Sequence, residues 1–211
     1  MNTFFICGMT ALWLVAIGFV VWAFRATSSK QRARLKRRTG KRLLSMARHN
    51  DYLLLENLSL PFEDSTISVD YFLLADKYCY CIVIRPYQGA VAGLNEDTKW
   101  TNVSLSEKKT NIDNPMQTNF LRAKTIEHWL KDGSSGSDRL VLPIVVIPDN
   151  LALDPQLHSE YKESYMFRLK YLLQGISNIE KTAGVPEFLP QSLSDIATKL
   201  NAIGHSKSLT A

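Results

Sequence analysis

The sequence predicts a mixed α/β domain that follows one N-terminal transmembrane helix. Three observations support this fold class. Residues 4–24 form an apolar stretch without a charged residue, three strand-length apolar runs follow one another closely from 52 to 84, and helical and strand-like segments then continue to residue 203. This order of elements is typical of a mixed sheet, here of about four strands, that is flanked by helices.

The stretch over 4–24 is long enough to cross a bilayer, because a hydrocarbon core of about 30 Å needs about 20 apolar helical residues. A cleaved signal peptide is the competing interpretation, and it would have a basic start, a shorter apolar core and a small-residue cleavage site. Met1, Asn2 and Thr3 precede the stretch, and Arg25 follows it directly. We therefore expect a single-pass helix, with residues 1–3 outside the cell or compartment.

A polybasic segment follows the apolar stretch. Ten basic residues and no acidic residue lie between Arg25 and Arg48. The tendency of basic flanks to stay inside predicts that the domain faces the cytoplasm from an inner or plasma membrane. Since the whole chain carries a net charge of +5, and all ten of these residues precede Asp51, the remainder carries −5.

Anionic lipid headgroups are the expected partner of the segment Arg25–Arg48. The alternative partner is the backbone of a nucleic acid. The segment has no interleaved aromatic residues on which bases would stack, and this absence favours lipid.

The first half of the domain predicts a helix and an antiparallel sheet. We expect a juxtamembrane segment over 25–37, the domain over 38–204 and a disordered tail over 205–211. Residues 30–49 have a helical apolar pattern, and the runs over 52–61, 67–75 and 78–84 predict a three-stranded meander. Alternation in the second run places four apolar side chains on one face: Ile67, Val69, Tyr71 and Leu73.

The second half predicts further helices around one buried strand. Residues 101–113 are polar and predict a loop, after which Asn114-Pro115 gives a helix start with Asn as the cap. The apolar run over 139–148 predicts a strand at the sheet centre or beside a parallel neighbour. Helices are expected over 160–178 and 191–203.

Cys79 and Cys81 have no second Cys/His pair at zinc-ligand spacing, so both are interpreted as core residues.

Five short features occur in a fixed order along the chain. They are Gly40-Lys41, Val69-Asp70-Tyr71, Val83-Ile84-Arg85, Trp100 and Asn114-Pro115-Met116-Gln117. In this order they resemble the NERD (nuclease-related domain) family, which has the PD-(D/E)xK restriction-endonuclease-like fold. The resemblance covers about residues 38–203. It implies a site in which a helix supplies Glu, one strand supplies Asp, and the next strand supplies Glu-x-Lys.

The chain departs from that pattern at three of the four positions. Asp70 is retained, whereas Lys41 and Val83 replace the two Glu residues and Arg85 replaces the Lys. Metal-assisted phosphodiester cleavage needs carboxylates to hold Mg²⁺ or Mn²⁺, and an arginine is too basic to deprotonate water.

Two roles for Asp70 remain open. In the first, it forms an ion pair with Arg85 or Lys41. In the second, it remains a metal ligand, and Glu56 or Glu63 replaces the lost carboxylates, with Glu56 placed across the hairpin from Asp70.

Three hypotheses for function follow from the resemblance and the departures. The preferred one is a membrane-anchored, nuclease-related domain that has lost cleavage and binds a protein or a nucleic acid. The first alternative is an active nuclease with a displaced carboxylate, which would need Mg²⁺ or Mn²⁺; otherwise no cofactor is expected. The second alternative is a structural subunit of a membrane-bound DNA-transfer or secretion assembly.

Overall fold

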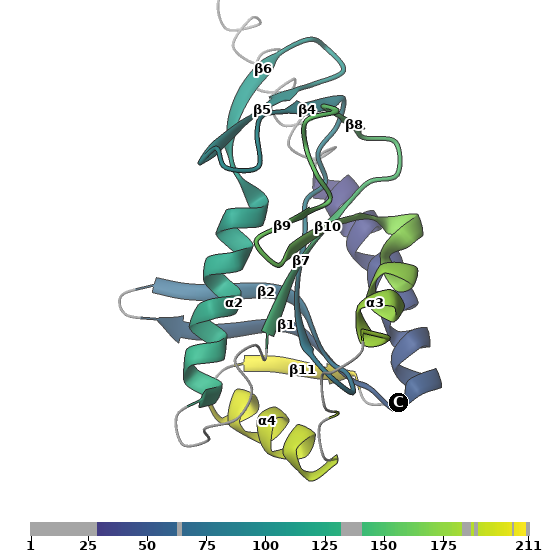
Figure 1. Ribbon diagram of the computed structural model, residues 1–211, viewed down its shortest axis with the longest axis vertical. Coiled ribbons are helices and arrows are strands. Elements are labelled where there is room, and N and C mark those ends of the chain that lie inside the picture. The colour runs from purple at the N-terminus through teal and green to yellow at the C-terminus, as the bar shows by residue number, and fades with distance from the viewer. Residues whose placement is uncertain are drawn as a thin grey trace, which may run out of the picture.

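A seven-stranded mixed sheet lies at the centre of the structure, a computed structural model that describes residues 29–62, 65–131, 141–182, 187, 190–203 and 205–209 (Figure 1). Its strands are β1 (Leu53–Phe62), β2 (Ser65–Leu74), β3 (Cys79–Ile84), β7 (Val141–Ile147), β9 (Glu160–Tyr161), β10 (Ser164–Arg168) and β11 (His205–Leu209). Their order across the sheet is β11-β1-β2-β3-β7-β10-β9.

The centre of this sheet confirms the strands that the sequence predicts. β1, β2 and β3 form an antiparallel meander. β7 lies between β3 and β10 and runs parallel to both, and every one of its side chains is buried. Burial on both faces explains why its sequence is apolar without alternation.

A second sheet of four strands packs at one end of the molecule (Figure 1). Its strands are β4 (Ala90–Ala92), β5 (Lys99–Val103), β6 (Lys109–Asp113) and β8 (Ala152–Leu153), in the order β6-β5-β4-β8. The predicted loop over 101–113 is therefore wrong, because β5 and β6 form a hairpin there. Trp100 and Ile112 are paired in this hairpin and supply its apolar contacts, while most of the other side chains are polar.

Helices cover both faces of the large sheet. On one face lie the helix over 29–50, hereafter the basic helix, and α3 (Leu172–Glu180), which follows the 3-10 turn η1 (Leu169–Tyr171). On the other face lie α2 (Pro115–Lys131) and α4 (Pro190–Ile203). Leu43 and Ile176 belong to the core of the first face, and Ile126 and Leu200 to the core of the second.

The predicted fold class needs correction in its sheet. The single sheet of about four strands is replaced by two sheets, of seven and four strands. The predicted helix over 160–178 is wrong in its first part, because Lys162 and Glu163 take positive φ angles of 47° and 64° and turn the chain between β9 and β10. β10 then pairs with β7, and α3 begins only at Leu172. Residues His205–Leu209, expected in a disordered tail, form β11 against β1.

The predicted transmembrane helix is not supported. None of the helices in the described part of the chain is long and apolar enough to cross a membrane. The stretch over 4–24, to which that prediction referred, lies outside the described residues.

Candidate functional site

The strand pattern changes at Asp70, the residue that the resemblance assigns to the family's site. Tyr71 and Leu73 belong to the core beneath the basic helix, whereas Val69 and Phe72 belong to the opposite core. Because successive side chains of a strand point to opposite faces, this membership means that the alternation shifts by one residue beside Asp70. On the neighbouring strand, Asn57 takes a left-handed φ of 57°. The prediction that Ile67 and Val69 share a face with Tyr71 is therefore wrong.

The Asp70 carboxylate is buried, with 7% of its surface exposed, and is bound on both oxygens. Oδ2 accepts a hydrogen bond from the backbone N–H of Ile84 at 2.8 Å. Oδ1 lies 3.2 Å from Lys36 Nζ and 3.4 Å from Arg32 Nη2, both on the basic helix. Among the described residues its ion-pair partners are thus Lys36 and Arg32, and not the predicted Arg85 or Lys41.

A cavity of about 490 Å³ opens beside Asp70. The basic helix, β1, β2, the end of β3 and α2 all contribute to its wall. Its cationic residues are Arg32, Lys36, Arg85 and Arg122, and Asp70 is the one acidic residue among those described that line it. Val83, Ser59 and Ser68 line it as well. The structure therefore brings together Asp70, Val83 and Arg85, whereas Lys41 is exposed on the basic helix and does not line the cavity.

Glu56 makes a different contact from the one expected for a substitute carboxylate. It pairs with Tyr71 across the β1–β2 hairpin, and its Oε1 lies 3.3 Å from the Tyr71 hydroxyl. Burial, with a smaller contribution from the Glu56 charge, raises the pKa of Tyr71 above its usual range. Glu56 is absent from the described lining of the Asp70 cavity, and Glu63 lies outside the described residues.

The donor set of the cavity does not fit a divalent cation. Mg²⁺ and Mn²⁺ need oxygen ligands with free lone pairs, usually including carboxylates. Here the single carboxylate already accepts three hydrogen bonds, and four cationic side chains surround it. Within the described residues, no three His, Cys, Asp or Glu side chains are grouped so that they would hold a metal ion.

Arg122 is a residue of this cavity that sequence reasoning missed. It lies on α2 between Asn119 and Ala123, which are both buried against the sheet. Its Nη1 is buried and has no hydrogen-bond partner among the described residues. Burial, together with the nearby charge of Arg85, lowers the pKa of the Arg122 guanidinium. The sequence signal that could have found Arg122 is its place among residues 119, 123 and 126, which helical spacing puts on the buried face of α2.

Two family features away from the cavity have structural roles. The Asn114 Oδ1 accepts hydrogen bonds from the N–H groups of Met116 at 3.0 Å and Gln117 at 3.3 Å, which caps α2 as predicted. Trp100 is buried, and its indole N–H donates to the carbonyl of Leu94 at 2.7 Å. Neither Asn114 nor Trp100 lines the Asp70 cavity.

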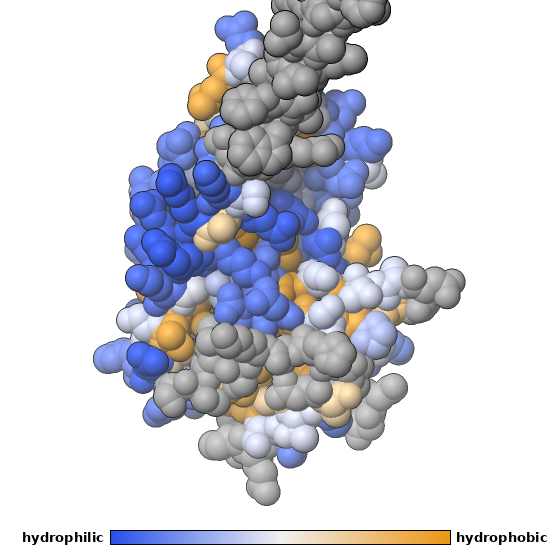
Figure 2. Space-filling view, turned by 180° about the vertical axis from the view of Figure 1, so that it is seen from behind, coloured by the Kyte–Doolittle hydropathy of each residue, from blue (hydrophilic) through white to orange (hydrophobic). Residues whose placement is uncertain are grey.

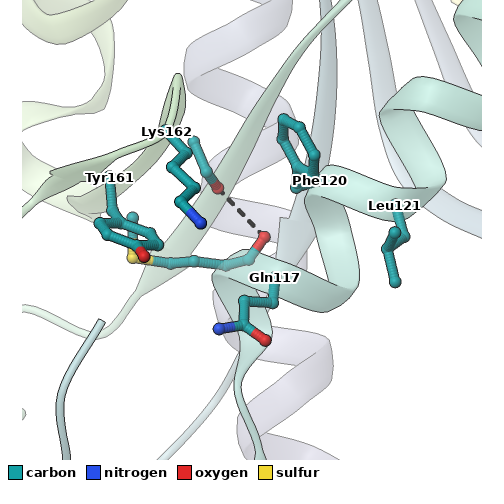
Figure 3. A pocket seen from close by; sticks show the side chains of 7 residues that line it. Gln117, Phe120, Leu121, Tyr161 and Lys162 are labelled. Carbon is teal, nitrogen blue, oxygen red and sulfur yellow. Dashed lines mark hydrogen bonds between the residues drawn. The ribbon is translucent and has the colours of Figure 1, made fainter. Parts of the chain in front are cut away.

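A second cavity of about 260 Å³ lies between α2 and the β9–β10 hairpin. Tyr161 and Lys162 of the hairpin lie opposite Gln117 and Phe120 of α2, and Ser164 Oγ donates to the carbonyl of Met116 at 3.2 Å (Figure 3). It contains none of the predicted site residues. Lys162 is the charged side chain among the described residues that line it.

The basic helix also presents an outer surface. Seven of its basic side chains are exposed, and these are Lys30, Arg32, Arg34, Arg37, Arg38, Lys41 and Arg48. Figure 2 shows hydrophilic side chains gathered on the side of the molecule where this helix lies. Arg32 and Lys36, on the side of the same helix that faces the sheet, line the Asp70 cavity.

The described structure is thus a mixed α/β domain whose Asp70 cavity is basic. Residues 31–148 match the model of the NERD family, described as the nuclease-related domain, and the chain belongs to this family. An uncharacterized protein of Bacillus anthracis is 29% identical over 91 residues, which are 43% of this chain. The matched region spans 42% of that relative's length. No solved structure matches the chain.

Proposed function

We propose that this chain is a nuclease-related module that binds nucleic acid without cleaving it. The observation that carries the proposal is the state of Asp70. Its carboxylate is held by Lys36, Arg32 and the Ile84 N–H, in a cavity with four cationic residues. A carboxylate engaged in this way neutralises and positions cations and has little capacity left to hold a metal.

The proposal for binding is supported by the distribution of charge. A nucleic acid is bound chiefly through its phosphates, and a binding protein presents them with a local basic surface. The net charge of −5 beyond residue 50 opposes binding over the whole domain. The exposed arginines nevertheless concentrate positive charge on the outer side of the basic helix, and Arg32 and Lys36 of the same helix line the cavity, so we place binding at this helix.

Cleavage is tested with the purified full-length protein, plasmid DNA and either Mg²⁺ or Mn²⁺. We expect no cleavage above that of a no-protein control. Cleavage that disappears in the Asp70→Ala variant would overturn the proposal, because it would require Asp70 to hold a catalytic metal.

Binding is tested by fluorescence anisotropy with labelled single- and double-stranded oligonucleotides in EDTA, over a series of salt concentrations. The double variant R34Q/R38Q removes two exposed charges of the basic helix, and we expect the slope of log affinity against log salt to fall by about 2. The charge-matched control K162Q/K199Q changes exposed lysines on the β9–β10 turn and on α4, and it should leave the slope unchanged. Binding to anionic lipid vesicles without binding to any oligonucleotide would contradict the proposal.

A further inference from the structure

The Arg122 guanidinium has a buried donor that the protein does not satisfy. Its Nη1 has no hydrogen-bond partner among the described residues. Most buried donors in folded proteins are paired, and an unpaired charged donor is especially unfavourable. The Arg122 side chain lines the Asp70 cavity, so an anion in this cavity lies beside a guanidinium that has an unsatisfied donor.

A second guanidinium, that of Arg85, lines the same cavity. Both guanidinium groups belong to residues that line one cavity, and the charge of Arg85 contributes to lowering the pKa of Arg122. Asp70 acts on the pKa of Arg122 in the opposite direction, but its oxygens are already bound by Lys36 and Arg32. An anion between Arg85 and Arg122 would offset their repulsion and accept bidentate hydrogen bonds.

The charge count favours an anion with more than one negative charge. Four cationic residues and one carboxylate line the cavity, which gives a net charge of +3. A phosphodiester within a strand carries one negative charge, whereas a phosphate monoester with a second pKa of about 6 carries nearly two at neutral pH. The volume of about 490 Å³ lies within the range of about 300–1,000 Å³ that is usual for small-ligand sites.

We propose that the cavity binds the terminal phosphate of a nucleic-acid strand on Arg122 and Arg85, without a divalent cation. This inference rests on the proposed function, because it names the group of the nucleic acid that enters the cavity. Arg32 and Lys36, held by Asp70, line the rest of the cavity and add positive charge around the phosphate. The exposed arginines of the basic helix then contact the phosphates that follow in the strand.

The test compares two oligonucleotides of one sequence, labelled at the 3′ end and carrying either a 5′-phosphate or a 5′-hydroxyl. Affinity for the full-length protein is measured by anisotropy in EDTA, with a mild non-ionic detergent present. We expect the phosphorylated strand to bind about tenfold or more tightly, the effect of charge-assisted hydrogen bonds to one added group. Inorganic phosphate at millimolar concentration should reduce this preference.

Four variants test whether the preference arises in the cavity. R122Q and R85Q should each abolish it, whereas R38Q should weaken the binding of both strands by the same factor. K199Q, on α4 and outside the lining of the cavity, should change neither affinity. Thermal unfolding of each variant identifies any that fails to fold. If R122Q fails to fold, R85Q tests the proposal in its place, since it changes a half-buried residue at the end of β3.

The two proposals fail in different ways. Equal affinity for both strands, or a preference that survives in both R122Q and R85Q, overturns the phosphate site while the nucleic-acid proposal stands. If the protein binds neither strand, the nucleic-acid proposal fails. In that case, stabilisation by inorganic phosphate of the original chain but not of R122Q supports the phosphate site, and no stabilisation overturns it as well.

Discussion

Oδ2 of Asp70 accepts the backbone N–H of Ile84 at 2.8 Å, a hydrogen bond that joins a buried carboxylate on β2 to the last residue of β3. Its other oxygen holds two cations of the basic helix. A single side chain thus links two strands to the helix that carries the exposed arginines. Asp70 therefore has a structural role that does not depend on catalysis.

Replacing Asp70 with Asn separates its charge from its hydrogen bond. Asn retains an acceptor for the Ile84 N–H but no longer neutralises Lys36 and Arg32, so we expect the free energy of unfolding to fall by about 1–3 kcal/mol. The affinity for oligonucleotides in EDTA should rise by about fivefold, since one unit charge at 4 Å is worth about 1 kcal/mol in water. Urea unfolding and anisotropy measure the two effects. A fall in oligonucleotide affinity would contradict the assignment of Asp70 as a cation anchor.

Replacing Asn114 with Ala removes the cap of α2 and two further hydrogen bonds. The Asn114 Nδ2 donates to the carbonyls of Asn95 at 2.9 Å and Asp97 at 2.8 Å, and the side chain is 1% exposed. We expect a loss of about 2–3 kcal/mol in the free energy of unfolding, measured in urea. The control N178A changes an exposed Asn in α3 and should cost much less. Equal losses in the two variants would show that the Asn114 contacts contribute little.

Replacing Gly40 with Ala tests the contact between the basic helix and β2. A Cβ at this position would lie 3.0 Å from Tyr71 Cζ and closer still to the Tyr71 hydroxyl. Gly→Ala inside an exposed helix would stabilise by about 1 kcal/mol, but here we expect destabilisation by about 1–3 kcal/mol from the clash.

The double variant G40A/Y71F checks that the Tyr71 hydroxyl is the cause. Removing the hydroxyl removes the nearest atom, so the cost of G40A should be smaller in the Y71F background, as measured in a double-mutant cycle. If G40A costs the same in both backgrounds, the hydroxyl contact is not what limits residue 40 to glycine.

Glu180 gives the protein a stability component that depends on pH. Burial raises the pKa of its carboxyl above the usual 4.5, although hydrogen bonds from Tyr80 Oη at 2.5 Å and the Lys77 N–H at 2.9 Å oppose the rise. The folded protein therefore binds more protons than the unfolded chain just above pH 4.5, and stability falls as pH rises through this window. We expect the unfolding free energy of the original chain minus that of E180Q to fall as the pH rises above 4.5, and then to level off. A difference that grows with pH would contradict the raised pKa.

Elements with local signals could be predicted from the sequence. Asn114-Pro115 specifies a helix start through its own side chain and ring, and the unbroken apolar run of β7 specifies burial on both faces. The shift in alternation at Asp70 could not be predicted in this way. It depends on how β2 lies between two separate cores, and a period of two along the sequence contains no information about that arrangement.

The residues of the candidate site could be predicted only in part, because some of them are brought together by packing and not by a local sequence signal. Asp70, Val83 and Arg85 could be placed together because they lie on adjacent strands in a family pattern. Arg32 and Lys36 were assigned to a polybasic flank, since counting charges along a helix does not show which of them turn toward the sheet. Arg122 comes from a helix distant in sequence, and only the packing of α2 against the sheet brings it to Arg85.

The pairing of β11 with β1 has a consequence for the behaviour of the molecule in concentrated solution. β1 would be an edge of the large sheet without β11, with a row of backbone donors and acceptors open to pairing with another chain. At the opposite edge, β9 is only two residues long and offers almost no template. β11 therefore covers the edge of β1 and prevents self-association there. We expect a chain truncated after residue 203 to aggregate through β1.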